Sequence, residues 1–219
     1  MHMQRKPRTA LAMIGAALLA SAPLWAGTAP APRLMDLGDP GLVKVNPEIL
    51  HDAMRKVYVD QILWTRMVTL SVLDGGKGKE AYVDRLMENY EACEELLVPY
   101  YGNGAEKFAE LLEEHVALTV EVMEAIRAGE VFASVLPPWY ENGDRLASVM
   151  TELNPKFWPE WESRMVWRKY LDSTLDNALA RLKGDWKADV QSYDALHLHA
   201  LVLADYMSLG MQRQFGPIK

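Results

Sequence analysis

The chain has 219 residues, half of them hydrophobic, which suffices for a substantial core in one large or two small domains. It is acidic, with 23 Lys and Arg against 30 Asp and Glu and a formal net charge of −7, and an acidic domain repels phosphate backbones. Nucleic acid is therefore excluded as an expected partner. The single cysteine, Cys93, cannot form a disulfide within the chain, and its place on an apolar helix face predicts a small buried side chain.

Residues 1–26 have the order of a secretory signal peptide. Three basic residues lie among the first eight, an apolar run follows from Ala10 to Ala22, and Leu24-Trp25-Ala26 offers a cleavage site. The run is short for a membrane span, which needs about 20 apolar residues, so an uncleaved anchor is the less favoured alternative. We expect export to the periplasm or the medium, with no integral membrane domain after cleavage.

Residues 27–45 form a leader rich in Pro, Ala and Gly, and residues 46–215 are expected to form a single domain. Apolar residues in this domain recur with the helical period, and no segment alternates with period two, which argues against a sheet. Short connections between long helices favour antiparallel neighbours. The sequence therefore predicts an all-α antiparallel helical bundle of four long helices and one or two shorter ones. The predicted helical segments are 47–74, 79–97, 105–128, 137–153, 160–182 and 186–210, while residues 130–136 remain ambiguous.

Several polar side chains fall on helix faces that are otherwise apolar. Gln61, His115 and Asn142 each lie inside an apolar stripe of a different helix, and His197 and His199 flank the main stripe of the last helix. If these helices pack together, the side chains could converge at a similar depth. A polar cluster in a bundle core must be satisfied, and a ligand, an ion or water could do so.

Charged residues form a second candidate set. Arg66 lies within a second apolar stripe of the first helix, and a helix that is apolar on both sides is expected to be central. A buried arginine needs an acidic partner, and Asp205, on the far side of the last helix, is the predicted one. Glu114 lies beside His115, and Asp194, three residues before His197, could share a ligand with it.

Common catalytic and cofactor motifs are absent from the sequence. It contains no His-Glu-x-x-His zinc motif, no Cys-x-x-Cys-His haem attachment site, no paired Glu-x-x-His elements and no Gly-x-Ser-x-Gly elbow. Methionine and histidine suit copper outside the cytoplasm, but the methionines are scattered, so core filling is the favoured role. Copper, zinc and noncovalent haem remain the alternative cofactors.

Several short stretches resemble a family of small, largely uncharacterised bacterial helical-bundle proteins. They include Trp64-Thr65-Arg66-Met67, Glu114-His115, Trp139-Tyr140-x-Asn142 and Ala204-Asp205-Tyr206-Met207. The resemblance covers residues 57–215 and implies a single helical domain without implying an activity. It also implies histidine at the position of Gln61, which this chain lacks.

Three functions follow as hypotheses. The leading one is an extracytoplasmic protein that binds a metal ion or small ligand at the inward cluster around Gln61, His115, Asn142 and His199. The second is an interaction protein with a satisfied polar core, and the third is an enzyme that uses His115 as a base oriented by Glu114 or Asp205. The partner surface of the second, if exposed, would be the aromatic stretch Phe157, Trp158, Trp161, Trp167 and Tyr170, although packing of these rings in the core is favoured.

Overall fold

The computed structural model describes residues 47–129 and 134–216, which form six α-helices and no strand. This confirms the predicted all-α helical bundle. The predicted signal peptide and leader lie outside the described residues, and none of the described helices is long and apolar enough to cross a membrane. The helices are α1 (Pro47–Leu73), α2 (Lys79–Tyr101), α3 (Asn103–Ala128), α4 (Leu136–Leu153), α5 (Glu160–Leu182) and α6 (Trp186–Phe215).

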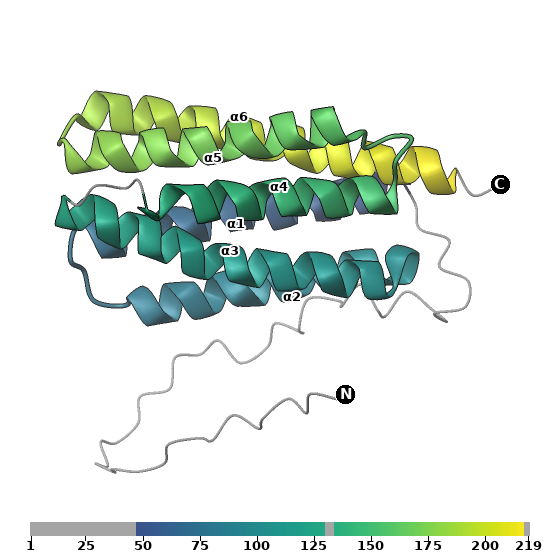
Figure 1. Cartoon of the computed structure of the whole chain (residues 1–219), viewed down its shortest axis with the longest axis horizontal. Helices are drawn as coiled ribbons and strands as arrows, with labels where there is room; N and C mark the ends of the chain where they lie inside the picture. The colour runs from purple at the N-terminus through teal and green to yellow at the C-terminus, as the bar shows by residue number, and fades with distance from the viewer. Residues whose placement is uncertain (1–46, 130–133, 217–219) are drawn as a thin grey trace, which may run out of the picture. The chain divides into compact units, whose positions relative to one another are not determined.

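The six helices close a ring. Each packs against the next one in the chain, and α6 returns to pack against α1. Additional contacts between α1, α3 and α5 cross the interior of the ring. Figure 1 shows the helices running along a common direction, with α2 and α3 on one side, α5 and α6 on the other, and α1 and α4 between them. The short connections make sequence neighbours antiparallel, as expected for a bundle.

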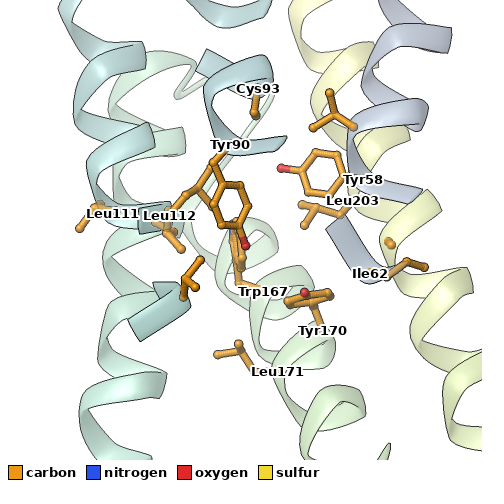
Figure 2. Close-up of a cluster of buried hydrophobic side chains, with 14 of the residues drawn as sticks. Tyr58, Ile62, Tyr90, Cys93, Leu111, Leu112, Trp167, Tyr170, Leu171 and Leu203 are labelled. Atoms are coloured by element: carbon orange, nitrogen blue, oxygen red, sulfur yellow. The ribbon is translucent and has the colours of Figure 1, made fainter. Parts of the chain in front are cut away.

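The largest fully buried side chains of the core are aromatic. Trp139, Trp158 and Trp167 have no exposed surface, and Tyr58, Tyr90 and Tyr170 are almost as deeply buried. Figure 2 shows Trp167 and Tyr170 of α5 between leucines of α3 and Ile62 of α1. Cys93 is buried and free, as the sequence predicts, and burial raises the pKa of its thiol to about 12.

Two helices extend beyond their predicted ends. α2 passes through Pro99 to Tyr101, because a proline in the last turn removes only one hydrogen-bond donor. α6 continues beyond Gly210 to Phe215. Gly210 does not end the helix; a Cβ atom at this position would overlap the Trp158 indole, so close packing explains the glycine.

The expectation that the first helix is buried on both sides is wrong for its second stripe. That stripe consists of Val59, Ile62, Leu63, Leu70 and Leu73. Ile62 and Leu73 are buried, whereas Leu63 is 43% exposed. α1 does contact α2, α3, α5 and α6, but one side of the helix still faces solvent. The far side of α6 is likewise exposed, at Leu198, Val202 and Leu209.

Candidate functional site

His115 and Asn142 form a buried polar pair that joins α3 to α4. The Nδ1 atom of His115 lies 2.9 Å from Oδ1 of Asn142, and Nδ2 of Asn142 donates to the carbonyl of Leu111 at 3.1 Å. Since the amide nitrogen of Asn142 serves the carbonyl, its oxygen must accept, and the proton of neutral His115 therefore sits on Nδ1. Both side chains lie inside the protein, at 3% and 1% exposure, as the sequence predicts.

Aromatic rings enclose this pair. The imidazole stacks on Trp139 with ring centres 5.8 Å apart, and Trp167 meets it edge-on at 6.2 Å. The indole of Trp139 in turn donates to Thr119 Oγ1 at 3.0 Å. Burial lowers the pKa of His115 to about 4, against smaller opposing effects of Asn142 and Glu114. The imidazole is therefore neutral at physiological pH.

Gln61 is buried in the same core but does not join this pair. Its Nε2 donates to the hydroxyl of Tyr170 at 3.2 Å. Tyr170 contacts Trp167 edge-on at 5.9 Å, and Trp167 contacts His115, so two aromatic rings separate the glutamine from the histidine. Gln61, His115 and Asn142 thus share one interior without sharing one hydrogen-bonded cluster.

The histidines of α6 also lie apart from His115. His199 is half-buried, and its Nδ1 lies 2.8 Å from Ser173 Oγ at the contact between α5 and α6. Burial lowers its pKa, and the charge of Lys169 acts in the same direction. His197 is half-buried and Asp194 exposed on the opposite side of α6. The structure therefore separates the five candidate ligand residues into four places: the His115–Asn142 pair, Gln61, His199 and His197.

Arg66 is partnered by an acid, but by Asp189 and not by Asp205. Its guanidinium contacts the Asp189 carboxylate at 2.5 and 2.9 Å and the side-chain oxygen of Asn177 at 2.5 Å. The ring of Tyr193 lies 5.2 Å from the guanidinium carbon. Asp189 lies seven residues before buried Leu196 and so falls on the same face of α6, a spacing from which an inward-facing acid could have been recognised.

Asp205 instead pairs at the surface with α1. Arg55 contacts its two oxygens at 2.6 and 2.7 Å, and Nε2 of His51 lies 2.9 Å from Oδ1. The hydrogen bond from Arg55 is the main cause that lowers the pKa of Asp205. The predicted pair of Arg66 with Asp205 is wrong because the two residues lie at different levels of the α1–α6 contact.

A groove of about 430 Å³ lies between α3 and α4, above the His115–Asn142 pair. Leu111, whose carbonyl holds Asn142, lines the groove, and Glu114 stands on its wall. Nη1 of Arg145 crosses the groove to both oxygens of Glu114, at 2.8 and 2.9 Å. Glu114 is therefore a residue of this groove and is not hydrogen-bonded to His115.

A second surface feature lies on the outward sides of the neighbouring helices α1 and α6. We call it the α1–α6 face. Its exposed apolar side chains are Leu63, Leu198, Val202 and Leu209, and Val59, Leu70 and Leu201 are half-buried on the same sides of the two helices. In the aromatic stretch of 157–170, Trp158, Trp167 and Tyr170 are core residues, which confirms the favoured packing and leaves no aromatic partner surface there; Trp161, at 66% exposure, faces solvent.

Within residues 47–129 and 134–216, no three His, Cys, Asp or Glu side chains are placed to hold a metal ion. Gln61, His115, Asn142 and His199 are not brought together as one cluster, since Gln61 bonds Tyr170 and His199 lies against Ser173. Comparison with known proteins adds no candidate: no family model, no curated protein and no solved structure matches the chain.

Proposed function

We propose that this chain is an exported interaction protein that docks an amphipathic helix of a partner protein onto the α1–α6 face. The observation that carries the proposal is the gathering of exposed large apolar side chains along two adjacent helices. Leu198 is 61% exposed, Val202 47% and Leu209 44%, beside Leu63 of α1 at 43%. Single exposed apolar residues are ordinary on protein surfaces, whereas four large ones on the outward sides of two neighbouring helices favour an interaction site.

The buried polar residues support the same proposal by what they already bind. His115, Asn142 and Gln61 hold partners within the protein at 2.9 to 3.2 Å. Such contacts satisfy buried polar groups and fix the packing of the helices around them. The polar groups of these three side chains are thus satisfied without a ligand, and we assign the three residues a structural role.

The shape of the face suits a helix. Leu198, Val202 and Leu209 follow the spacing of one side of a helix, and α1 runs alongside α6. From Leu198 to Leu209 this side extends about 17 Å at the helical rise of about 1.5 Å per residue. A third helix can lay its own apolar stripe between two neighbouring helices, a common mode of peptide recognition.

The charges beside the α1–α6 face indicate which kind of partner helix it would bind. Asp52 and Asp194 are exposed at the borders of the face, and Arg55 and Lys56 of α1 already pair with Asp205 and Asp60. The exposed cations Lys187 and Arg213 lie at the two ends of the α6 stripe, outside the span from Leu198 to Leu209. The chain as a whole carries a formal charge of −7. A partner helix with Lys or Arg beside its apolar stripe is therefore favoured, and a second acidic copy of this chain is disfavoured.

Two synthetic peptides test the proposal. Both place leucine at the first, fourth and fifth position of each heptad, and one has lysine and the other glutamate elsewhere. We expect the folded protein to bind the lysine peptide and not the glutamate peptide when fluorescence anisotropy is measured at about 0.15 M salt. The double variant Leu63→Gln/Leu198→Gln should weaken binding at least about tenfold, since two apolar contacts are lost.

Met165→Gln provides the matched control, because Met165 is 56% exposed on α5 outside the face. It should leave the affinity unchanged. Equal binding of both peptides, or equal weakening by Met165→Gln, would contradict the proposal. Sedimentation of the protein alone supplies a further test: a dimer that Leu198→Gln dissociates would assign the face to a second copy and overturn the choice of a basic partner.

A further inference from the structure

The groove between α3 and α4 is a second surface of defined chemistry, separate from the α1–α6 face. Its floor contains Leu111 and Val149, which are 6% and 3% exposed. The bond from Asn142 to the Leu111 carbonyl ties α4 to α3 directly beneath it. Both walls therefore stand on a part of the core that is fixed by a buried hydrogen bond.

Two ion pairs bridge the groove. Lys107 reaches Glu152 at 2.7 Å, and Arg145 reaches Glu114 at 2.8 Å. Both pairs are largely solvent-exposed, so neither contributes much to stability. Each ion pair nevertheless engages one of the two cations that line the groove, Lys107 and Arg145.

Glu110 lies between the two bridges. It is three residues after Lys107 and four before Glu114, so the three side chains share one side of α3. Among the described residues, no cation comes within ion-pair distance of Glu110, although its side chain lines the groove. Together with two cations and two further carboxylates, Glu110 leaves the groove a formal charge of −1, from +2 and −3.

We infer that this groove binds a small organic cation, with an ammonium or guanidinium group on Glu110 and an aliphatic part over Leu111 and Val149. Ser148 adds an acceptor, because its hydroxyl donates to the carbonyl of Asp144 and its oxygen stays available to a ligand N–H. The volume of about 430 Å³ is within the range of small-molecule sites. Glu110 offers a single carboxylate, which suits an organic cation better than a divalent metal.

Titration with 1,5-diaminopentane, followed by amide chemical shifts, tests the inference. We expect saturable shifts that map to α3 and α4 around residues 107–114 and 145–152. The neutral analogue 1,5-pentanediol should not produce them. Glu110→Gln should weaken binding of the diamine at least about tenfold, as expected when a charge-assisted hydrogen bond is removed.

Glu113→Gln is the matched control, because Glu113 is exposed on the same helix and carries the same charge but does not line the groove. Its affinity for the diamine should equal that of the unaltered protein. Equal weakening by Glu113→Gln would show nonspecific attraction to an acidic protein and would overturn the inference. Unchanged binding in Glu110→Gln, or no saturable shift at millimolar diamine, would overturn it as well.

Discussion

Arg66 and Asp189 lie 123 residues apart in the chain and form a two-point ion pair between α1 and α6. Asn177 of α5 accepts from the same guanidinium and donates to the Asp189 carboxylate, so three helices meet at one charge pair. The Arg66 side chain is 15% exposed to solvent and the Asp189 side chain 4%. Hydrogen bonding from Arg66 is the main cause that lowers the pKa of Asp189.

Removing one partner of this pair should be costly. In Asp189→Leu the guanidinium of Arg66 stays largely buried without its carboxylate, and we expect a loss of about 3 kcal/mol in the free energy of unfolding, measured with urea. Asp205→Leu is the matched control, since the pair of Asp205 with Arg55 is much more exposed and should cost about 1 kcal/mol or less. Similar losses in the two variants would show that burial does not determine the cost.

His115 should make stability depend on pH. Its pKa in the folded protein is about 4, below the ordinary value of 6.5, so the unfolded chain takes up the proton first as pH falls. The stabilisation is present above about pH 6.5 and is lost progressively down to about pH 4, by up to about 3 kcal/mol. Urea unfolding at several pH values should show this decline.

His115→Gln removes the titrating group and keeps a side-chain N–H that can donate. The other titrating groups are common to both proteins, so the difference in their slopes between pH 6.5 and 4 isolates His115. The variant should show the shallower slope. Identical slopes would mean that His115 is protonated in the folded protein as readily as in the unfolded chain.

The helical period predicted the fold because every buried face repeats every three to four residues. The same rule predicted that Gln61, His115 and Asn142 point inward, since face membership depends only on local spacing. It could not predict their partners, because the level at which two helices meet is set by packing of the whole bundle. Helical spacing allows either Asp205 or Asp189 as the partner of Arg66. Only the register of α1 against α6 selects Asp189.

The prediction that the last helix ends at Gly210 was wrong for a related reason, since α6 continues to Phe215. Locally, Gly210 resembles a helix stop, but Trp158 occupies the space where a Cβ would lie. The Trp158 indole donates to the carbonyl of Tyr206 at 3.1 Å, which fixes the ring against this part of α6. The requirement for glycine thus comes from a residue 52 positions away, which local sequence rules do not register.

Gly210→Ala should therefore destabilise the protein although alanine favours helices. Overpacking against a fixed indole costs about 1–3 kcal/mol, and the gain in helix propensity offsets about 1 kcal/mol at most. We expect a net loss on the order of 1 kcal/mol in thermal or urea unfolding, with a change in tryptophan fluorescence. Gly76→Ala is the control, because a Cβ there meets Ser71 at an ordinary 3.6 Å. A stabilised Gly210→Ala protein would exclude the close contact.

Asn142→Asp should convert the neutral pair with His115 into an ion pair. The Asn142 oxygen already lies 2.9 Å from Nδ1, so a carboxylate in its place would favour the protonated imidazole. We expect the pKa of His115 to rise from about 4 by about one to three pH units, measured by NMR titration of the imidazole. The ionised aspartate cannot donate to the Leu111 carbonyl, so the variant should also lose stability.

Glu114→Gln serves as the comparison, because the charge of Glu114 acts on His115 in the raising direction only weakly, and its removal should lower the pKa slightly. A pKa that is unchanged in Asn142→Asp would mean that Nδ1 does not face residue 142, and the link between α3 and α4 beneath the groove would have to be redrawn.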